Sequence, residues 1–414
     1  MDGDVSVSHG WQDYWVVKLA SDGSIEWEKS FGGTEHDVAT DILQTSDGGY
    51  IVAGRADSED GQVTNHLGIT DYWIIKLSID GSIEWQKNFG GSGNDFAYTI
   101  FQTSDRGYVV GGASDSVNGD ITDPHGDYDY WVVKLSNEGE LEWQKSLGGS
   151  KDDFLYSIEQ TDDGGYIGAG KSQSNNGDVT GNHGGGNFVH DYWVVKLSSE
   201  GELEWQKSLG GTDHESASSV RQTDDGNYIV GGFARSTNGD VIGNHGGWDY
   251  WIVKLDTIGE IIWQKSFGGT DDDLSHAFQL TNDGGYIAVG SSKSTWGEVT
   301  GNHGGQDFWA IKITDSGELD WQKSLGGNGN EIAFSVQQTT DDGLIVAGQT
   351  SSNNGDVSGN HGSNDFWVVK LDACVNIDLE VEENTIQSLE TAESSTYQWI
   401  DCNIGEMIVG EENT

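Results

Sequence analysis

The amino-acid sequence is dominated by a repeat of 58 residues, and this repeat limits the possible folds more than any other feature. An Asp-aromatic-Trp triplet marks each copy, and successive triplets are separated by 58, 58, 62, 58, 58 and 58 residues. The one longer step contains an insertion at Gly185 to His190. A period this regular predicts tandem copies of one supersecondary unit. The triplets begin at Asp13, Asp71, Asp129, Asp191, Asp249, Asp307 and Asp365.

Each copy predicts four short β-strands and no helix. Segments such as "DYWVVKL", "IEWQKSLG", "SIEQT" and "YIVAG" are rich in β-branched and aromatic residues and too short for helices. Asp-Gly and Gly-Gly pairs between them supply the positive φ angles of tight hairpins. Four-stranded antiparallel sheets repeated about six times predict an all-β fold, a β-propeller. A β-solenoid is the alternative, although solenoid repeats usually have about 20–45 residues.

The strand count favours six blades. The strand "D-Y/F-W-V-V-K-L" occurs seven times, whereas each other strand occurs six times. We therefore expect strands from the two ends of the chain to pair and complete one blade, with one strand left over. Seven blades remain the alternative, although a seven-bladed ring would need three further strands.

One tryptophan in each copy lies in the Trp-Gln-Lys strand or its equivalent. A large apolar ring at a fixed place in every copy suits the junction between stacked blades, where an aromatic side chain can bury about 150–250 Å². We expect these side chains to dock neighbouring blades and to be almost fully buried. They are Trp27, Trp85, Trp143, Trp205, Trp263 and Trp321.

The strong negative charge narrows the choice of partners. The chain has 69 acidic and 20 basic residues, a formal net charge of −49. Such a surface repels nucleic acid and anionic membranes, and it attracts cations. No apolar stretch approaches the roughly 20 residues of a membrane span.

Cys374 and Cys402 lie outside the repeats, and we expect them to pair in an extracytoplasmic setting.

The run "VVKLSSEGELEWQKSLGG" and the later "Q-T-x-D-G-G-Y-I-V-A-G" pattern resemble the long Gly-rich repeats of secreted Bacteroidota proteins. Those proteins are typically cargo of the type IX secretion system and are predicted to be propellers. The resemblance implies a propeller over residues 1–371. The following segment, 372–414, is similar to the start of an Ig-like module and is expected to be a partial β module. "KLSSEGELEW" also resembles quinoprotein-type propellers, which implies that the "SIEQT" strand is innermost.

A carboxylate follows the Gly-Gly pair of every copy. On an innermost strand, six such side chains would surround the mouth of a central channel and repel one another. A Ca²⁺ ion, which takes 6–8 oxygen ligands, would suit that arrangement. The alternative is that each acid caps its own turn. The six are Asp37, Asp95, Asp153, Glu215, Asp273 and Glu331.

A loop of the form "N-G-D-V-T-G-N-H-G-G" carries one acid and one histidine per copy. The paired His spacing of zinc sites is missing, so we expect the imidazoles to order a Gly-rich loop. Oxygen ligands from these loops could also hold Ca²⁺ one blade at a time. Gln62 replaces the acid in one copy. The principal pairs are Asp120 and His125, Asp178 and His183, Asp240 and His245, Glu298 and His303, and Asp356 and His361.

The function predicted from these features is a non-catalytic extracellular protein for binding or adhesion, with a glycan or a protein as ligand and Ca²⁺ as a stabilising ion. The alternative is a carbohydrate-active enzyme, a polysaccharide lyase or glycosidase, that uses His190 or His214. An active site should break the symmetry of the repeats, because it needs unlike residues to converge. The main breaks are the insertion, Pro124, Trp11, Trp248, Trp296, Arg55, Arg106, Arg221 and Arg235.

Overall fold

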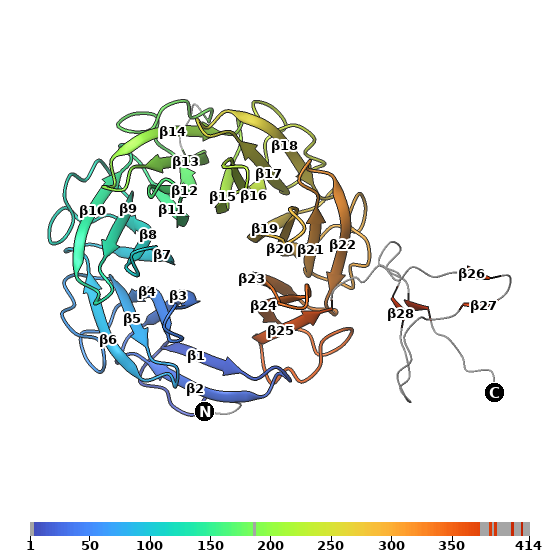
Figure 1. The fold of residues 1–414 in the computed structure, drawn as a ribbon, viewed down its shortest axis with the longest axis horizontal. Coiled ribbons are helices and arrows are strands. Elements are labelled where there is room, and N and C mark those ends of the chain that lie inside the picture. Colours follow the sequence, from blue (N-terminus) through green and yellow to red (C-terminus); the bar gives the residue numbers. More distant parts are fainter. Residues whose placement is uncertain are drawn as a thin grey trace. The chain divides into compact units, whose positions relative to one another are not determined.

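The computed structural model describes residues 4–184 and 188–372, and four two-residue strands after them. The protein is an all-β propeller of six four-stranded blades, as the repeat predicts (Figure 1). No helix occurs among the described residues. None of their segments is therefore a helix that could cross a membrane.

Five blades are continuous antiparallel sheets in which four consecutive strands pair in chain order. In the blades from β3 to β18 the first strand is innermost and the fourth is outermost (Figure 1). The first strands are β3 (Asp37–Gln44), β7 (Asp95–Gln102), β11 (Asp153–Gln160), β15 (Glu215–Gln222), β19 (Asp273–Leu280) and β23 (Glu331–Gln338). The second strands are β4 (Tyr50–Ala56), β8 (Tyr108–Ser114), β12 (Tyr166–Ser172), β16 (Tyr228–Ala234), β20 (Tyr286–Ser292) and β24 (Leu344–Thr350).

The third strands carry the Asp-aromatic-Trp triplet, and the fourth strands carry the Trp-Gln-Lys segment. The third strands are β1 (Tyr14–Leu19), β5 (Asp71–Leu77), β9 (Asp129–Leu135), β13 (Asp191–Leu197), β17 (Asp249–Leu255), β21 (Asp307–Ile313) and β25 (Asp365–Leu371). The fourth strands are β2 (Ile25–Phe31), β6 (Ile83–Phe89), β10 (Leu141–Leu147), β14 (Leu203–Leu209), β18 (Ile261–Phe267) and β22 (Leu319–Leu325).

The chain divides into two compact units, residues 1–278 with 294–298 and residues 279–293 with 299–414. The first unit contains the hairpin β1–β2 and the second contains the three-stranded sheet β23–β24–β25. That terminal strands complete one blade stays a prediction. The segments β26 (Val381–Glu382), β27 (Thr385–Ile386), β28 (Trp399–Ile400) and β29 (Met407–Ile408) form two small antiparallel pairs. Cys374 and Cys402 lie outside the described residues, and the Ig-like module stays a prediction.

The third strands form the core of the first unit. Strands β5, β9 and β13 are buried on both faces because each lies between two strands of its own sheet and between two sheets. The tyrosine of each triplet also links blades through a hydrogen bond. The Tyr72 hydroxyl donates to the Trp131 carbonyl at 3.0 Å, and the Tyr130 hydroxyl donates to the Trp193 carbonyl at 2.8 Å. The triplet tryptophans that are fully buried are Trp73, Trp131, Trp193, Trp251 and Trp309.

The expectation of almost complete burial is wrong for the six tryptophans of the fourth strands, which are only half-buried. They do reach the next blade. The Trp143 ring lies 5.5 Å from the Tyr166 ring of the following sheet, and it covers Gly201, where a Cβ atom would approach the indole to 2.8 Å. The outer strand is the rim of the blade, so these side chains keep part of their surface exposed. The half-buried set is Trp27, Trp85, Trp143, Trp205, Trp263 and Trp321.

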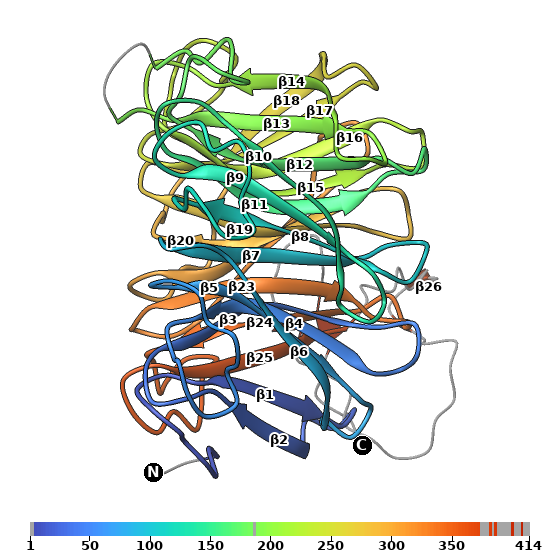
Figure 2. The ribbon, with the colours of Figure 1, turned by 90° about the vertical axis from the view of Figure 1, so that its left-hand side faces the viewer.

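Antiparallel pairing assigns the connections of the first unit to two faces. The Asp-Gly turns after the first and third strands lie on one side, which we call the turn face. The His-Gly loops after the second strands and the Gly-Gly linkers after the fourth strands lie on the other side, the loop face. Figure 2 shows the strands of this unit running between the two sets of connections. The loop face therefore gathers the acidic residues, the histidines and the insertion.

Candidate functional site

The acid after each Gly-Gly pair is fully buried at the start of the first strand. The Asp153 carboxylate accepts hydrogen bonds from the Gly149 amide at 2.8 Å and from the Ser174 hydroxyl at 3.0 Å. Glu215 accepts equivalent bonds from the Gly211 amide and the Ser236 amide, at 2.9 and 3.0 Å. The same amide contact occurs at Asp37, Asp95, Asp273 and Glu331. Each acid thus closes the linker of its own blade.

Burial raises the pKa of several of these carboxyls, because the charged form loses its hydration. The pKa rises to about 6 for Asp95 and to about 7 for Asp153 and Glu215. Hydrogen bonds from serine hydroxyls and backbone amides oppose the rise without cancelling it.

The loop acids accept hydrogen bonds from the first glycine of the Gly-Gly pair, whereas the linker acids accept from the second. The Asp178 carboxylate accepts from the Gly148 amide at 3.2 Å, 30 residues earlier in the chain. The Gln62 side chain in the deviating copy accepts from the Gly32 amide at 2.9 Å. A neutral oxygen therefore makes the same contact as a charged one. The contact recurs for Asp120, Asp240, Glu298 and Asp356.

The loop histidines lie against the aspartate of the triplet. His183 Nδ1 is 2.8 Å from Asp191 Oδ2, and His303 Nδ1 is 2.8 Å from Asp307 Oδ2. His245 makes the same contact at 2.9 Å. His361 lies 3.4 Å and His125 3.9 Å from the corresponding aspartates. The backbone amide of each of these histidines donates to the same carboxylate oxygen.

Sequence reasoning used the triplet aspartates only as an alignment mark and missed their position. Five of them are buried and Asp13 is half-buried, and one oxygen of each of these six has no hydrogen-bond partner among the described residues. That oxygen lies beside the same glycine as the Gly-Gly acid: a Cβ atom on Gly90 would lie 2.4 Å from Asp71 Oδ1 and 2.5 Å from Asp95 Oδ2. A carboxylate at the start of an otherwise apolar strand was the available signal. The oxygens belong to Asp13, Asp71, Asp129, Asp191, Asp249 and Asp307.

The described residues contain no group of three or more His, Cys, Asp or Glu side chains placed to hold a metal ion. Pairs of carboxylates do meet, as at Asp71 and Asp95. Binding of Ca²⁺ to either set of acids stays a prediction.

The second and fourth residues of the first strands differ between repeats, and on β7 and β11 all four are aromatic, namely Phe96, Tyr98, Phe154 and Tyr156. Tyr98 on β7 lies 5.1 Å from Tyr156 on β11, measured between ring centroids. Tyr128, just before β9, stacks on Phe154 at 5.1 Å and on Phe96 at 5.8 Å. All five side chains are half-buried. We call these residues, 96, 98, 128, 154 and 156, the aromatic wall.

Two cationic side chains cover the aromatic wall. The Arg55 guanidinium carbon lies 5.0 Å from the Phe96 ring, and Lys171 Nζ lies 5.1 Å from the Phe154 ring. These distances are within the range of cation–π attraction. Burial lowers the pKa of Lys171. The Nε atom of Arg55 is buried without a hydrogen-bond partner in the described part of the chain.

A histidine pair continues this region toward β15. His190, at the end of the insertion, and His214 approach with their Nδ1 atoms 2.8 Å apart. Burial, followed by the nearby charges of Lys171 and His214, lowers the pKa of His190 to about 3. One imidazole must therefore donate and the other accept. The His214 ring lies 6.1 Å from Trp248, whose ring contacts Phe233 at 5.2 Å.

The remaining symmetry breaks do not form one site. The Trp11 side chain is 77% exposed and lies 5.9 Å from the His36 ring. Trp296 is 76% exposed. Arg221 forms an ion pair with Glu159 at 3.8 Å on the innermost strands. Sequence reasoning found Arg55, His190, His214 and Trp248 but missed the aromatic wall, whose signal is "DFAY" and "DFLY" where another copy has "ESAS".

Comparison with known proteins gives distant similarities. No protein-family model matches the chain. The regulatory protein FlaEY of Caulobacter vibrioides is 23% identical over 359 residues, in an alignment that covers 77% of this chain and 36% of FlaEY. This chain thus spans about a third of the length of that relative.

Among solved structures, Sqt1 from Chaetomium thermophilum has a TM-score of 0.40 and 10% identity, covering 75% of this chain and 66% of Sqt1. The extracellular domain of the hybrid two component system BT4673 from B. thetaiotaomicron has a TM-score of 0.18 and 11% identity, covering 97% and 64%. Identities this low do not assign the chain to a family, so its function has to follow from the site itself.

Proposed function

We propose that the protein is a non-catalytic extracellular binding module, secreted or held at the cell surface, that captures a glycan on its loop face. The observation that carries this proposal is the aromatic wall with its two cations. It lies where the copies of the repeat differ from one another, whereas the positions that repeat have structural partners in every blade.

The chemistry of the wall suits sugar rings. Half-buried aromatic side chains keep part of their surface exposed, and that surface can pack against the C–H groups of a pyranose. Arg55 and Lys171 add hydrogen-bond donors beside the rings. Aromatic side chains that are already ordered by packing lose little conformational entropy on binding, which favours affinity.

The competing function, a carbohydrate-active enzyme using His190 or His214, has less support. A general acid or base is most effective when its pKa lies near the working pH. Burial, Lys171 and His214 hold the pKa of His190 at about 3, far below that range. His214 is engaged by His190 through its Nδ1 atom. The pair is better suited to a rigid neutral wall than to proton transfer.

The test is a panel of oligosaccharides measured by isothermal titration calorimetry, with a reducing-end assay on the same samples. We expect binding without new reducing ends, and at least tenfold weaker binding by Tyr98→Ala and Tyr156→Ala. Ser218→Ala, at the fourth position of β15, is the matched control and should bind normally. Release of reducing ends would favour the enzyme, and unchanged binding by both tyrosine variants would disprove a site at the wall.

A further inference from the structure

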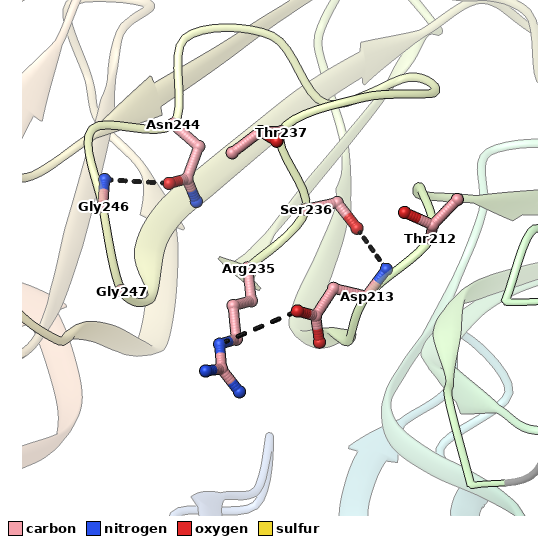
Figure 3. Close-up of a pocket in the computed structure, with 8 residues that line it drawn as sticks. All are labelled: Thr212, Asp213, Arg235, Ser236, Thr237, Asn244, Gly246 and Gly247. Carbon is pink, nitrogen blue, oxygen red and sulfur yellow. Dashed lines mark hydrogen bonds and ion pairs between the residues drawn. The ribbon is translucent and has the colours of Figure 1, made fainter.

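A hollow of about 280 Å³ opens beside the histidine pair. Figure 3 shows the side chains around it, including Thr212, Asp213, Arg235 and Asn244. Gly246 and Gly247 complete this edge of the lining, and Trp248 follows directly. Except for Arg235 and Asp213, the lining groups are uncharged.

The guanidinium of Arg235 is only loosely held. Its Nε atom is 3.8 Å from Asp213 Oδ2, and the two side chains are 52% and 44% exposed. An exposed pair of this kind contributes little to stability. No protein acceptor lies within hydrogen-bond distance of the two terminal nitrogens in the described part of the chain, and Figure 3 shows only Nε directed at Asp213. Two parallel donors therefore remain for a ligand.

The donors that remain on Arg235 match one chemical group well. A planar guanidinium offers two N–H groups in the spacing of the two oxygens of a carboxylate, which gives a bidentate, charge-assisted contact. In a chain of formal charge −49, a cation with free donors is also unusual. The hollow thus selects an anionic group that can approach edge-on.

An aromatic surface lies next to this lining, because Trp248 directly follows Gly247. Phe233 is in β16, and Arg235 follows the last residue of that strand. Phe233 contacts Trp248, which is half-buried. A ligand whose charged group reaches Arg235 can therefore place its ring near Trp248.

We propose that this hollow is a subsite for the carboxylate of a uronic acid residue, so that the glycan bound by the protein is an acidic polysaccharide. The inference rests on the proposed function, because it names the class of the ligand. Arg235 would bind the carboxylate, and the neutral lining groups would surround the hydroxyls of the same sugar.

The experiment compares uronate oligosaccharides with their methyl esters, which keep the ring and the linkage but lose the charge. Calorimetric titrations with galacturonate, glucuronate and mannuronate oligomers should show at least one acid that binds tenfold or more tighter than its ester. Arg235→Gln should abolish that difference, and Asp213→Asn should tighten binding of the acid because it frees the guanidinium.

Arg106→Gln is the matched control. Arg106 lines another hollow, of about 290 Å³, on the turn face, so its loss should leave the preference for the acid unchanged. Equal binding of acid and ester, or equal effects of Arg235→Gln and Arg106→Gln, would overturn the subsite. If Tyr156→Ala still weakened binding in that case, the proposed function would stand. Failure of the wild type to bind any oligomer, neutral or acidic, would overturn both.

Discussion

The blades β11–β14 and β15–β18 share the same strands, turns and buried linker acids, which we call the frame. They present different side chains on their innermost strands. Asp153 and Glu215 are both fully buried and both accept from the second glycine of their linker, at 2.8 and 2.9 Å. One residue further on, the first blade has Phe154 and the second has Ser216. The same repeat therefore combines a fixed frame with variable positions on the innermost strand.

The fourth position of the strand shows what the difference means. The Ser218 hydroxyl donates to the Gly231 carbonyl at 3.2 Å and to the Ser275 carbonyl at 3.0 Å. Thr40 makes the equivalent contacts on β3. Tyr156 occupies this position on β11 and packs instead against Tyr98 at 5.1 Å. A polar side chain at this position thus bonds to backbone carbonyls, whereas the aromatic one packs against the neighbouring blade.

The largest expected effect comes from breaking the frame. Trp193→Ala should lower the free energy of unfolding by about 3–5 kcal/mol, because it leaves a cavity in place of a fully buried indole. Trp131→Ala and Trp251→Ala, at the same position in other blades, should cost about as much. Urea denaturation measures all three, with Trp143→Ala as the half-buried comparison. A larger loss for Trp143→Ala than for Trp193→Ala would contradict this assignment of the core.

A smaller effect should appear as a dependence of stability on pH. The folded pKa of Asp153 and of Glu215 is about 7, above the unfolded values near 4. Between these values the folded state binds more protons than the unfolded state, so stability falls as pH rises from about 4 to 7 and changes little above that. Denaturation midpoints at a series of pH values should show this decline.

Asp153→Asn and Glu215→Gln should each flatten the decline, and by similar amounts if the two blades share one frame. Asp224→Asn removes an exposed charge and controls for the change in net charge. Stability that rose with pH across this window would show that hydrogen bonds to these carboxylates outweigh their burial.

Much of the frame follows from the sequence, because it depends on short-range chemistry that repeats. Asp-Gly turns, strand lengths and the 58-residue period are local signals, and six blades follow from counting them. The buried position of Trp193 could not be separated from that of Trp143 in this way. Both are repeated tryptophans on strands, and only the stacking of the sheets decides which one is enclosed.

The candidate site was less accessible to sequence reasoning. Arg55 and His190 stood out as departures from the repeat, but the contact of Tyr98 with Tyr156 joins residues 58 positions apart on different blades. The contact depends on which strand is innermost. A resemblance to known propellers suggested that strand, but no local pattern determined which of its residues meet across blades.

Exchanging one variable residue should sharpen the comparison without disturbing the frame. Tyr156→Ser converts the fourth position of β11 to that of β15, and we expect about tenfold weaker glycan binding with a small change in stability. A tenfold change is about 1.4 kcal/mol, within the range of one aromatic contact. The reverse change, Ser218→Tyr, should leave binding at the wall intact. Loss of folding in Tyr156→Ser would show that the tyrosine belongs to the frame.

The smallest expected effect concerns Ca²⁺. Asp71 Oδ1 and Asp95 Oδ2 both lie beside Gly90, and burial together with the nearby Asp95 charge raises the pKa of Asp71 to about 6, so a hard cation that binds there would relieve the repulsion between the two carboxylates. A ligand that binds only the folded state stabilises it by about 1 kcal/mol at five times its dissociation constant. Melting temperatures should therefore be higher in millimolar CaCl₂ than in NaCl of equal ionic strength.

Asp95→Asn and Asp153→Asn should reduce the difference if the linker acids bind the ion, whereas Asp178→Asn and Asp240→Asn should do so if the loop acids bind it. General screening by salt depends on ionic strength and not on the identity of the cation. Equal melting curves in the two salts would therefore show that these carboxylates serve the frame without an ion.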